Sequence, residues 1–93
     1  MRTIEWTTQF KRDYRRESKG AYRNTLDLEL FSVIEALASD RALAPRLRDH
    51  ALVGEWKDCR DCHIKPDLVL IYMRSGLDAL RLIRLGSHSE LGL

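Results

Sequence analysis

The sequence predicts an α+β fold in which a short N-terminal strand and two helices pack with a small antiparallel sheet. Apolar residues recur three or four positions apart between Tyr22 and Leu37, which is typical of a helix with one buried face. From Leu68 to Met73 the chain is apolar without alternation, which indicates a strand covered on both faces at the centre of the sheet. Because 93 residues suffice for only one hydrophobic core, residues 1–93 are expected to form a single domain.

The N-terminal part of the chain carries a strand signal followed by a helix signal. Residues 3–6 alternate between polar and apolar side chains, which predicts a short strand. Thr7 or Thr8 offers the side-chain oxygen of an N-cap, and Phe10 and Tyr14 are spaced to face inward from the helix that follows. We therefore expect the chain to enter the sheet first and then to cover it with a helix.

A second helix and a meander of strands complete the predicted fold. Gly20 separates the first helix from the second, and Pro45 ends the helical part because proline disfavours a helical residue before it. Ser75 and Gly76 make a turn between two strands, and a short tail follows Gly86. The strands of the meander are expected at residues 53–57, 60–65, 68–73 and 80–85.

Composition places the chain among ordinary globular proteins. Hydrophobic residues make up 44% of the sequence and charged residues 32%, so the chain is too apolar to remain disordered. The N-terminus has no apolar segment of signal-peptide length, and the apolar run at residues 68–73 is far too short to cross a membrane. We therefore expect a cytoplasmic protein with no membrane partner, in which both cysteines are reduced.

Positive charge is concentrated in one short segment. The net charge is only +2, but residues 11–23 hold six basic and two acidic side chains, a local excess of +4. If this segment is helical, the spacing of three and four residues places most of its cations on one stripe. Such a stripe is either a solvated helix face or a surface that follows phosphates. The candidate RNA- or ribosome-binding residues are Lys11, Arg12, Arg15, Arg16, Lys19 and Arg23.

Cys59, Cys62 and His63 match the C-x-x-C-H pattern of covalent haem attachment, and zinc is a second interpretation of the same residues. Covalent haem requires export, which the N-terminus does not support. Cysteines three apart on an extended strand point to opposite faces, which makes them a poor chelate for zinc. At least one of the two cysteines is therefore predicted to be a small buried apolar residue, and no metal is expected.

Five polar side chains are candidates for catalysis. The three histidines lie near the ends of predicted elements, where active sites are usually assembled. Arg84 interrupts an apolar strand face, so it either lies at an exposed strand end or has a function there. A ribonuclease without a metal needs a base for the 2′-hydroxyl, an acid for the leaving 5′-oxygen and a cation for the phosphate, and histidine and arginine supply these groups. The candidate residues are His50, His63, Asp67, Arg84 and His88.

Several motifs resemble the core pattern of YafQ-type toxins, a branch of the RelE/ParE toxin superfamily. The matching residues are His50-Ala51-Leu52-Val53-Gly54-Glu55-Trp56, then Arg60, His63, Pro66-Asp67, Ile71-Tyr72 and Arg84-Leu85-Gly86-Ser87-His88. The resemblance covers nearly the whole chain. It implies the RelE/ParE toxin fold, a compact sheet with two N-terminal helices, and a ribosome-dependent endoribonuclease that cleaves messenger RNA in the ribosomal A site.

The resemblance also implies roles for the candidate residues. His88 would be the general acid of the reaction. His50, His63 and Asp67 would share the deprotonation of the 2′-hydroxyl, and Arg84 would contact the scissile phosphate. Because the substrate's own 2′-hydroxyl is the nucleophile, no metal or other cofactor is implied, and DNA would not be cut.

The resemblance further implies partners. An antitoxin, a small protein with an extended or helical segment, would wrap and neutralise the toxin, and operator DNA would be bound only indirectly through that antitoxin. The 70S ribosome and messenger RNA are the other implied partners, and the basic segment becomes a contact for ribosomal RNA. Leu68 and Gly92 stand where the family commonly has aromatic residues, which puts codon preference and catalytic efficiency in question.

Two alternatives keep the same fold. A ParE-like toxin would bind DNA gyrase without nuclease activity, and it would not need three histidines, Asp67 and Arg84 at these positions. The second alternative, which the altered Leu68 and Gly92 leave open, is an inactive or purely structural antitoxin-binding domain. Toxicity of the chain, and its dependence on the histidines, would separate both alternatives from a ribonuclease.

Overall fold

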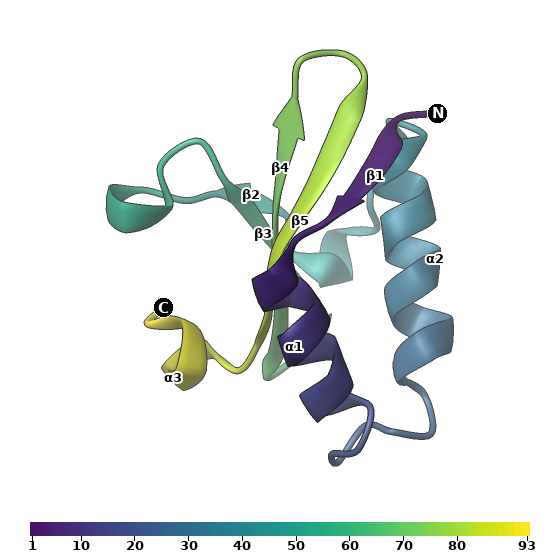
Figure 1. The fold of residues 1–93 in the computed structure, drawn as a ribbon, viewed down its shortest axis with the longest axis vertical. Helices are drawn as coiled ribbons and strands as arrows, with labels where there is room; N and C mark the ends of the chain where they lie inside the picture. The colour runs from purple at the N-terminus through teal and green to yellow at the C-terminus, as the bar shows by residue number, and fades with distance from the viewer.

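The computed structural model describes all residues from 1 to 93 and contains one five-stranded sheet with the strand order β1-β5-β4-β3-β2 (Figure 1). The predicted α+β class is confirmed. No helix has the length and apolar character needed to span a membrane. In chain order the elements are β1 (Thr3–Trp6), α1 (Thr8–Glu17), α2 (Leu26–Ala38), the 3-10 turn η1 (Pro45–Leu47), β2 (His50–Ala51), the 3-10 turn η2 (Gly54–Trp56), β3 (Arg60–Lys65), β4 (Leu68–Ser75), β5 (Ala79–Gly86) and α3 (His88–Leu91).

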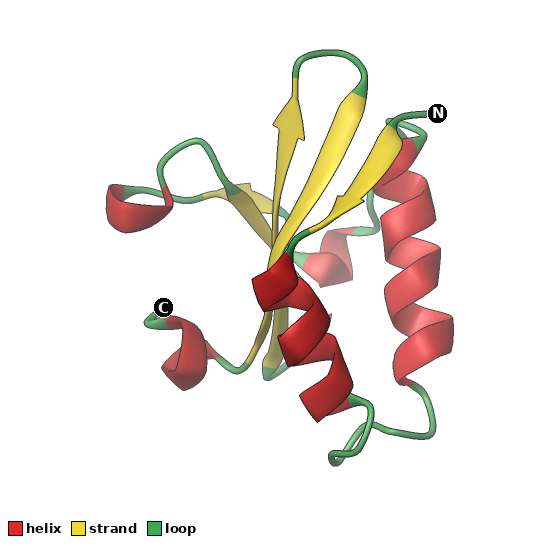
Figure 2. Cartoon of the chain, in the orientation of Figure 1, coloured by secondary structure: helices red, strands yellow, loops and turns green.

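The two faces of the sheet are covered unequally. Helices α1 and α2 lie on one side of the sheet, and the short helix α3 lies on the other (Figure 2). The side under α1 and α2 holds the main core of sixteen buried residues, whereas only four form the second cluster, which includes Val69, Ile71 and Leu91. Because apolar burial supplies most of the stabilisation, α1 and α2 anchor the fold, and the second face stays largely free for a site.

Most predicted elements are confirmed. β1 spans residues 3–6, and the helix after it is capped by Thr7, whose hydroxyl oxygen accepts a hydrogen bond from the Phe10 amide. Phe10 is buried, and Tyr14 packs against the main core. β3 covers the predicted residues 60–65, while β4 and β5 extend the predicted strands by two residues each. β4 lies at the centre of the sheet, as its apolar run predicts.

The segment 53–57 is not a strand, and this prediction was wrong. Gly54 adopts a left-handed backbone with φ +68°, so the chain turns through η2 instead. Val53, at the start of this segment, is 86% exposed. The strand on the outer edge of β3 is instead the two-residue β2, which sets His50 opposite Asp61.

The helix boundaries and the chain end also differ from the prediction. The second helix begins at Leu26, so Tyr22 lies in the preceding turn, although it still packs against the core. The tail after Gly86 forms the helix α3, which a capping box stabilises. Ser87 accepts a hydrogen bond from the Glu90 amide, and the Glu90 carboxylate accepts one from the Ser87 amide. The Ser-x-x-Glu spacing is the signal in the sequence for this helix.

β1 pairs parallel with β5, so the sheet is antiparallel only from β5 to β2. The prediction of a wholly antiparallel sheet was wrong at this edge. Tight turns force consecutive strands to run antiparallel, but both helices separate β1 from the strands that follow it. No turn therefore determines the direction of β1.

A β-bulge in β5 reorients Arg84. The register pairs Ile71 with Arg84 and Tyr72 with Leu82, which leaves Ile83 as an extra residue. The alternation of side chains along β5 changes phase at this point, so Arg84 does not share the buried face of Leu82. The bulge explains how an arginine interrupts an apolar strand without entering the core.

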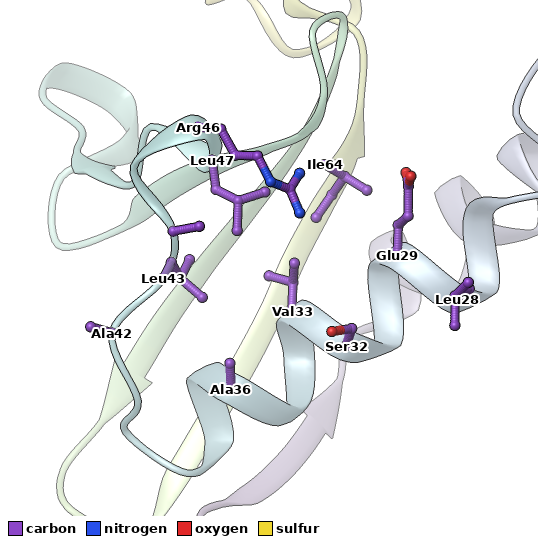
Figure 3. A pocket seen from close by; sticks show the side chains of 11 residues that line it. Leu28, Glu29, Ser32, Val33, Ala36, Ala42, Leu43, Arg46, Leu47 and Ile64 are labelled. Carbon is purple, nitrogen blue, oxygen red and sulfur yellow. The ribbon is translucent and has the colours of Figure 1, made fainter.

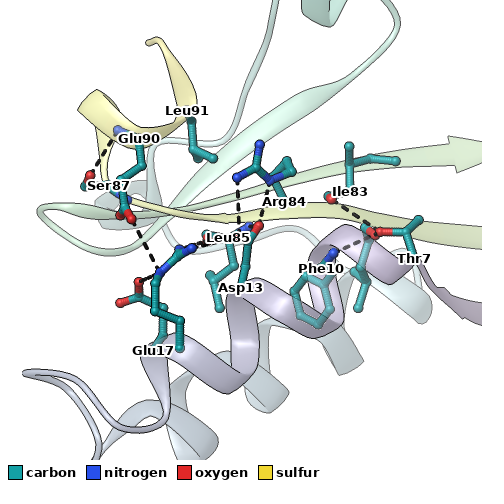
Figure 4. A network of polar contacts seen from close by, with 12 residues as sticks. Thr7, Phe10, Asp13, Glu17, Ile83, Arg84, Leu85, Ser87, Glu90 and Leu91 are labelled. Carbon is teal, nitrogen blue, oxygen red and sulfur yellow. Dashed lines mark hydrogen bonds and ion pairs between the residues drawn. The ribbon is translucent and has the colours of Figure 1, made fainter.

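Side chains of α1 complete the edge of β5 beyond the end of β1. β1 pairs only with residues 79–82, so on this edge of β5 no strand lies beside Leu85, which pairs with Leu70 of β4 on its other side. The Asp13 carboxylate accepts a hydrogen bond from the Leu85 amide at 3.0 Å, and Arg16 donates one to the Leu85 carbonyl, also at 3.0 Å. Asp13 also accepts a hydrogen bond from Arg84 at 2.7 Å (Figure 4). Two side chains of α1 thus take the place of a neighbouring strand.

Replacing Asp13 by asparagine should lower the free energy of unfolding by about 2–4 kcal/mol, because a buried carboxylate with charged partners is lost. Burial opposes ionisation of Asp13, but hydrogen bonds from Arg84 and the Leu85 amide outweigh it and lower the pKa of Asp13. The stabilisation is therefore present above the ordinary pKa of aspartate and is lost as the pH falls through the lowered pKa. Urea unfolding at pH 7 and at acidic pH measures both effects.

Glu35→Gln is the matched control for this substitution. Glu35 is exposed and forms a single surface ion pair with Arg41 at 3.7 Å. Its replacement should change the free energy of unfolding by less than about 0.5 kcal/mol. An Asp13→Asn protein as stable at pH 7 as this control would contradict the role assigned to the Asp13 carboxylate.

Candidate active site

Three histidines lie in a row on the sheet face that α1 and α2 leave open. Cys62 and Ile64 of β3 point into the main core, so the alternation of the strand places His63 on the opposite face. β2 brings the ring of His50 to 6.4 Å from that of His63, measured between centroids, and α3 brings the ring of His88 to 5.0 Å. The structure thus brings together all three histidines selected from the sequence.

A carboxylate accompanies each outer histidine of the row. Asp61 Oδ1 lies 3.0 Å from His50 Nδ1, and Asp67 Oδ1 lies 3.3 Å from His88 Nδ1. His50 Nδ1 also lies 2.8 Å from the backbone carbonyl of Arg48, which can only accept a hydrogen bond. Nδ1 of His50 therefore carries a proton, and its Nε2 is free to accept one from a substrate.

Burial shifts the pKa values of the two central residues of the site, Asp61 and His63. Burial raises the pKa of Asp61, which is 2% exposed, although the neighbouring histidines oppose this shift. Burial also lowers the pKa of His63, an effect that Asp61 opposes and His88 strengthens. A histidine whose pKa lies below its ordinary value is mostly neutral at pH 7. The central ring of the row is therefore a neutral imidazole under physiological conditions.

One pocket of about 410 Å³ opens onto the three histidines. The other residues that line it are Arg48, Leu52, Asp61 and Leu93. The imidazoles can accept and donate protons, and the guanidinium can attract a phosphate. The pocket therefore combines the groups that acid–base cleavage of a phosphodiester needs.

Asp61 is a site residue that the sequence analysis did not select. The alternation of β3 was the available signal, because it places Asp61 on the same face as His63. Its burial and its contact with His50 depend on the pairing of β2 with β3. That pairing was missed because a two-residue strand has no recognisable pattern.

Asp67 and Arg84 lie at the margins of the site. Asp67 is in the turn between β3 and β4, its side chain is 70% exposed, and it reaches the row through His88. Arg84 is partly buried, and two of its nitrogen atoms bind Asp13 at 2.7 and 3.3 Å. Neither residue lines the histidine pocket.

The basic segment 11–23 does not form one helical stripe, because the condition for that stripe, a helix through the whole segment, is not met. α1 ends at Glu17, so Lys19 and Arg23 lie in the turns that follow. Arg16 binds three carboxylates and a backbone carbonyl, so it is a structural residue. The cations of the segment that stay exposed without an ion pair are Lys11, Arg12, Arg15, Lys19 and Arg23.

Cys59 and Cys62 pack on opposite sides of the sheet, as their spacing predicts. Cys62 belongs to the main core, and Cys59 packs in the smaller cluster with Val69 and Ile71. Both are free, and burial raises the pKa of both thiols. The prediction that at least one of them is a small buried apolar residue is confirmed, and the structure buries both. The C-x-x-C-H pattern does not direct the two thiols towards a common ligand.

Comparison with known proteins identifies close relatives. Residues 2–92 match the family model described as a bacterial toxin of type II toxin–antitoxin systems, YafQ. The chain is 38% identical over 93 residues to a YafQ toxin of Haemophilus influenzae, covering 97% of this chain and 91% of the relative. It is 34% identical over 92 residues to the mRNA interferase toxin YafQ of Escherichia coli K12, with 97% and 95% covered.

A solved structure shares the whole fold. The crystal structure of the E. coli DinJ-YafQ toxin–antitoxin complex contains a chain that matches with a TM-score of 0.82 at 33% identity, covering 97% of this chain and 96% of that one. Together, the helix-backed sheet, its histidine-lined face and these matches define the class as a type II toxin with the RelE/ParE fold. Within this class, the chain belongs to the YafQ toxin family, as its motifs suggest.

Histidine titration provides a test of the electrostatics of the site. In the wild-type protein the pKa of His63 should lie below its ordinary value of 6.5, because burial disfavours the charged ring. Asp61→Asn should lower the pKa of His63 further, since the Asp61 carboxylate opposes the shift. NMR titration of the imidazole resonances measures both values.

Asp67→Asn is the matched control for this titration. It also neutralises one carboxylate, but Asp67 pairs with His88 rather than with His63. The change in the pKa of His63 should therefore be smaller than in Asp61→Asn. A rise of the His63 pKa in Asp61→Asn would show that the Asp61 carboxylate does not act on this ring as described.

Proposed function

We propose that this chain is the toxin of a type II toxin–antitoxin system and a ribosome-dependent endoribonuclease that cleaves messenger RNA in the ribosomal A site, which stops translation. The observation that carries the proposal is the row of three histidines, two of them paired with carboxylates, in one open pocket. The E. coli relative is named an mRNA interferase, which supports the same substrate class. Residues 1–93 act as one toxin domain.

The two outer histidines are placed to serve as the base and the acid when the substrate's own 2′-hydroxyl attacks the phosphorus. In an in-line displacement the attacking and leaving oxygens lie on opposite sides of the phosphorus, so the base and the acid must be separated. His50 takes the proton of the 2′-hydroxyl at its free Nε2, and His88 gives a proton to the leaving 5′-oxygen. The new bond from the 2′-oxygen to phosphorus replaces the bond to the 5′-oxygen, which yields a 2′,3′-cyclic phosphate and a 5′-hydroxyl without a cofactor.

The other site residues orient these groups and the phosphate. The Arg48 carbonyl accepts the Nδ1 proton of His50, and Asp67 lies within hydrogen-bond distance of Nδ1 of His88, so that Nε2 of each outer ring is left for the substrate. Asp61 lies 3.0 Å from Nδ1 of His50 and stabilises positive charge on that ring. His63 lies beside both rings and, as a neutral imidazole, can share the role of the base or bind a phosphate oxygen. Asp13 orients the guanidinium of Arg84, whose remaining donors are assigned to the scissile phosphate.

Membership of the YafQ family supports an antitoxin partner, and the exposed cations support binding to ribosomal RNA. The E. coli relative forms a toxin–antitoxin complex with DinJ, and we infer that this chain has its own antitoxin, through which operator DNA is bound. The 70S ribosome and messenger RNA are its targets, which places its action in the cytoplasm. The unpaired cations that suit ribosomal RNA are Lys11, Arg12, Arg15, Lys19 and Arg23.

Leu68 and Gly92, which stand where the family commonly has aromatic residues, lie in different surroundings. Leu68 is 1% exposed and belongs to the main core. Gly92 ends α3 with φ +72°, a conformation that larger residues rarely adopt. Neither position supplies a ring for stacking on an RNA base, so codon preference depends on other contacts.

His88→Ala should slow cleavage of ribosome-bound messenger RNA by about 10²–10⁴-fold, because one positioned proton transfer is lost. Primer extension in a reconstituted translation system, with and without ribosomes, compares the cut positions and rates of wild type and variant. Ser89→Ala is the control, because Ser89 is the exposed neighbour of His88 on the same helix. The control should cut at the same codons and the same rate as the wild type.

Other results would redirect the proposal. If the His88→Ala protein cut messenger RNA as fast as the wild type, His88 would not be the general acid. A wild type that cuts no messenger RNA but still stops growth would favour a gyrase-binding toxin. A wild type without any toxicity would favour a structural antitoxin-binding domain.

A further inference from the structure

A second pocket adjoins the histidine pocket and shares Arg48, His63 and His88 with it. Its volume is about 470 Å³. The wall carries three permanent cations, two imidazoles and no carboxylate, so it attracts an anion rather than an apolar ligand. The residues that line only this second, cationic pocket are Arg46, Ile64, Lys65 and Pro66.

Two of the three cations have no partner within the protein. Lys65 binds Glu29 at 2.6 Å and lies over the ring of Tyr22, so its charge is already compensated. Arg46 and Arg48 are both exposed and form no ion pair. A pair of free guanidinium groups beside the catalytic histidines is available for the phosphate of a ligand.

The backbone holds Arg48 in an unfavourable conformation. Leu47 is buried in the main core and ends η1, and Arg48 follows with φ +49° and ψ +45°, in the left-handed region. Glycine or asparagine adopts this region more readily than arginine. The requirements of folding alone would therefore favour another residue at this position.

Arg46 lies on the other side of Leu47 from Arg48 in the chain and reaches the same pocket. Its side chain extends towards Ile64 of β3 (Figure 3). Arg46 and Ile64 also line an apolar groove of about 320 Å³ between α2 and residues 42–47. The aliphatic part of Arg46 can rest on this apolar rim while its charged end faces the cationic pocket.

We propose that Arg46 and Arg48 bind the messenger RNA phosphate next to the scissile one. This inference rests on the proposed ribonuclease function. The scissile phosphate occupies the histidine pocket, and the RNA backbone continues past His63 and His88 into the cationic pocket. Arginine suits this role because its planar fork of donors binds two phosphate oxygens at once. Phosphates carry no sequence information, so the pair aligns the RNA without choosing the codon.

The test compares Arg46→Gln/Arg48→Gln with the wild type in cleavage of one ribosome-bound messenger RNA. KM should rise about tenfold or more with little change in kcat, because the lost contacts are made equally in the ground and transition states. The set of cleaved codons should stay the same. The dependence of kcat/KM on salt should become shallower, because fewer phosphates are neutralised.

Two further variants separate binding from folding. Arg41→Gln/Lys57→Gln removes the same charge from exposed positions outside both pockets and should behave as the wild type. Arg48→Asn should keep or raise the thermal unfolding midpoint, because asparagine tolerates the left-handed backbone, while KM still rises. A lower midpoint together with an unchanged KM would make Arg48 a structural residue and overturn the inference.

Three results in the cleavage assay would also overturn it. A double variant with the kinetics of the control would show that the pair does not bind the messenger RNA. A fall in kcat at unchanged KM would place the pair on the scissile phosphate. If the double variant lost as much affinity for ribosomes that carry no messenger RNA as for ribosomes that carry it, the arginine pair would bind ribosomal RNA instead. If the wild type itself cuts nothing, the proposed function fails, whereas the other three results leave that function intact.

Discussion

The arrangement of α1, β5 and α3 depends on the interactions of one buried carboxylate, that of Asp13. It binds the Leu85 amide and Arg16, and Arg16 in turn binds Glu90 of α3. An anion inside a protein is tolerated only when its partners are in place, because leaving it unpaired costs several kcal/mol. Two side chains of α1, Asp13 and Arg16, thereby couple the open edge of the sheet to the helix that carries His88.

The candidate active site depends on the same sheet in a different way, because each of its three histidines comes from a different element. The register of β2 on β3 sets Asp61 opposite His50, and the chain leaving β5 brings His88 beside His63. The elements that carry the outer histidines are short, with two residues in β2 and four in α3. Elements with few contacts open at low free energy. The outer histidines can therefore adjust to a bound RNA more easily than His63, which lies in the longer strand β3.

The fold class and the histidines were predictable from the sequence because both rest on local patterns, namely the helical spacing of α2, the apolar run of β4 and the family motifs. Asp61 and the orientation of Arg84 were not, because they depend on pairing between strands. A two-residue strand leaves no pattern, and the bulge at Ile83 changes the phase of β5 without any local signal. The basic stripe does not form because α1 already ends at Glu17. Arg16, which does lie on α1, is engaged by groups on β5 and α3, and the sequence gives no local signal for these contacts.

The distribution of ion pairs explains how a chain with a net charge of only +2 can present cationic surfaces. Most acidic side chains are engaged by basic ones within the fold, as Asp13 is by Arg84 and Asp49 by Arg60. These pairs neutralise one another locally and leave other cations without compensation, including Arg46 and Arg48 beside the histidines. Attraction of RNA over a Debye length depends on such local excess rather than on the total charge. The surface that suits RNA is therefore defined by which cations the fold leaves unpaired, and only the three-dimensional structure contains that information.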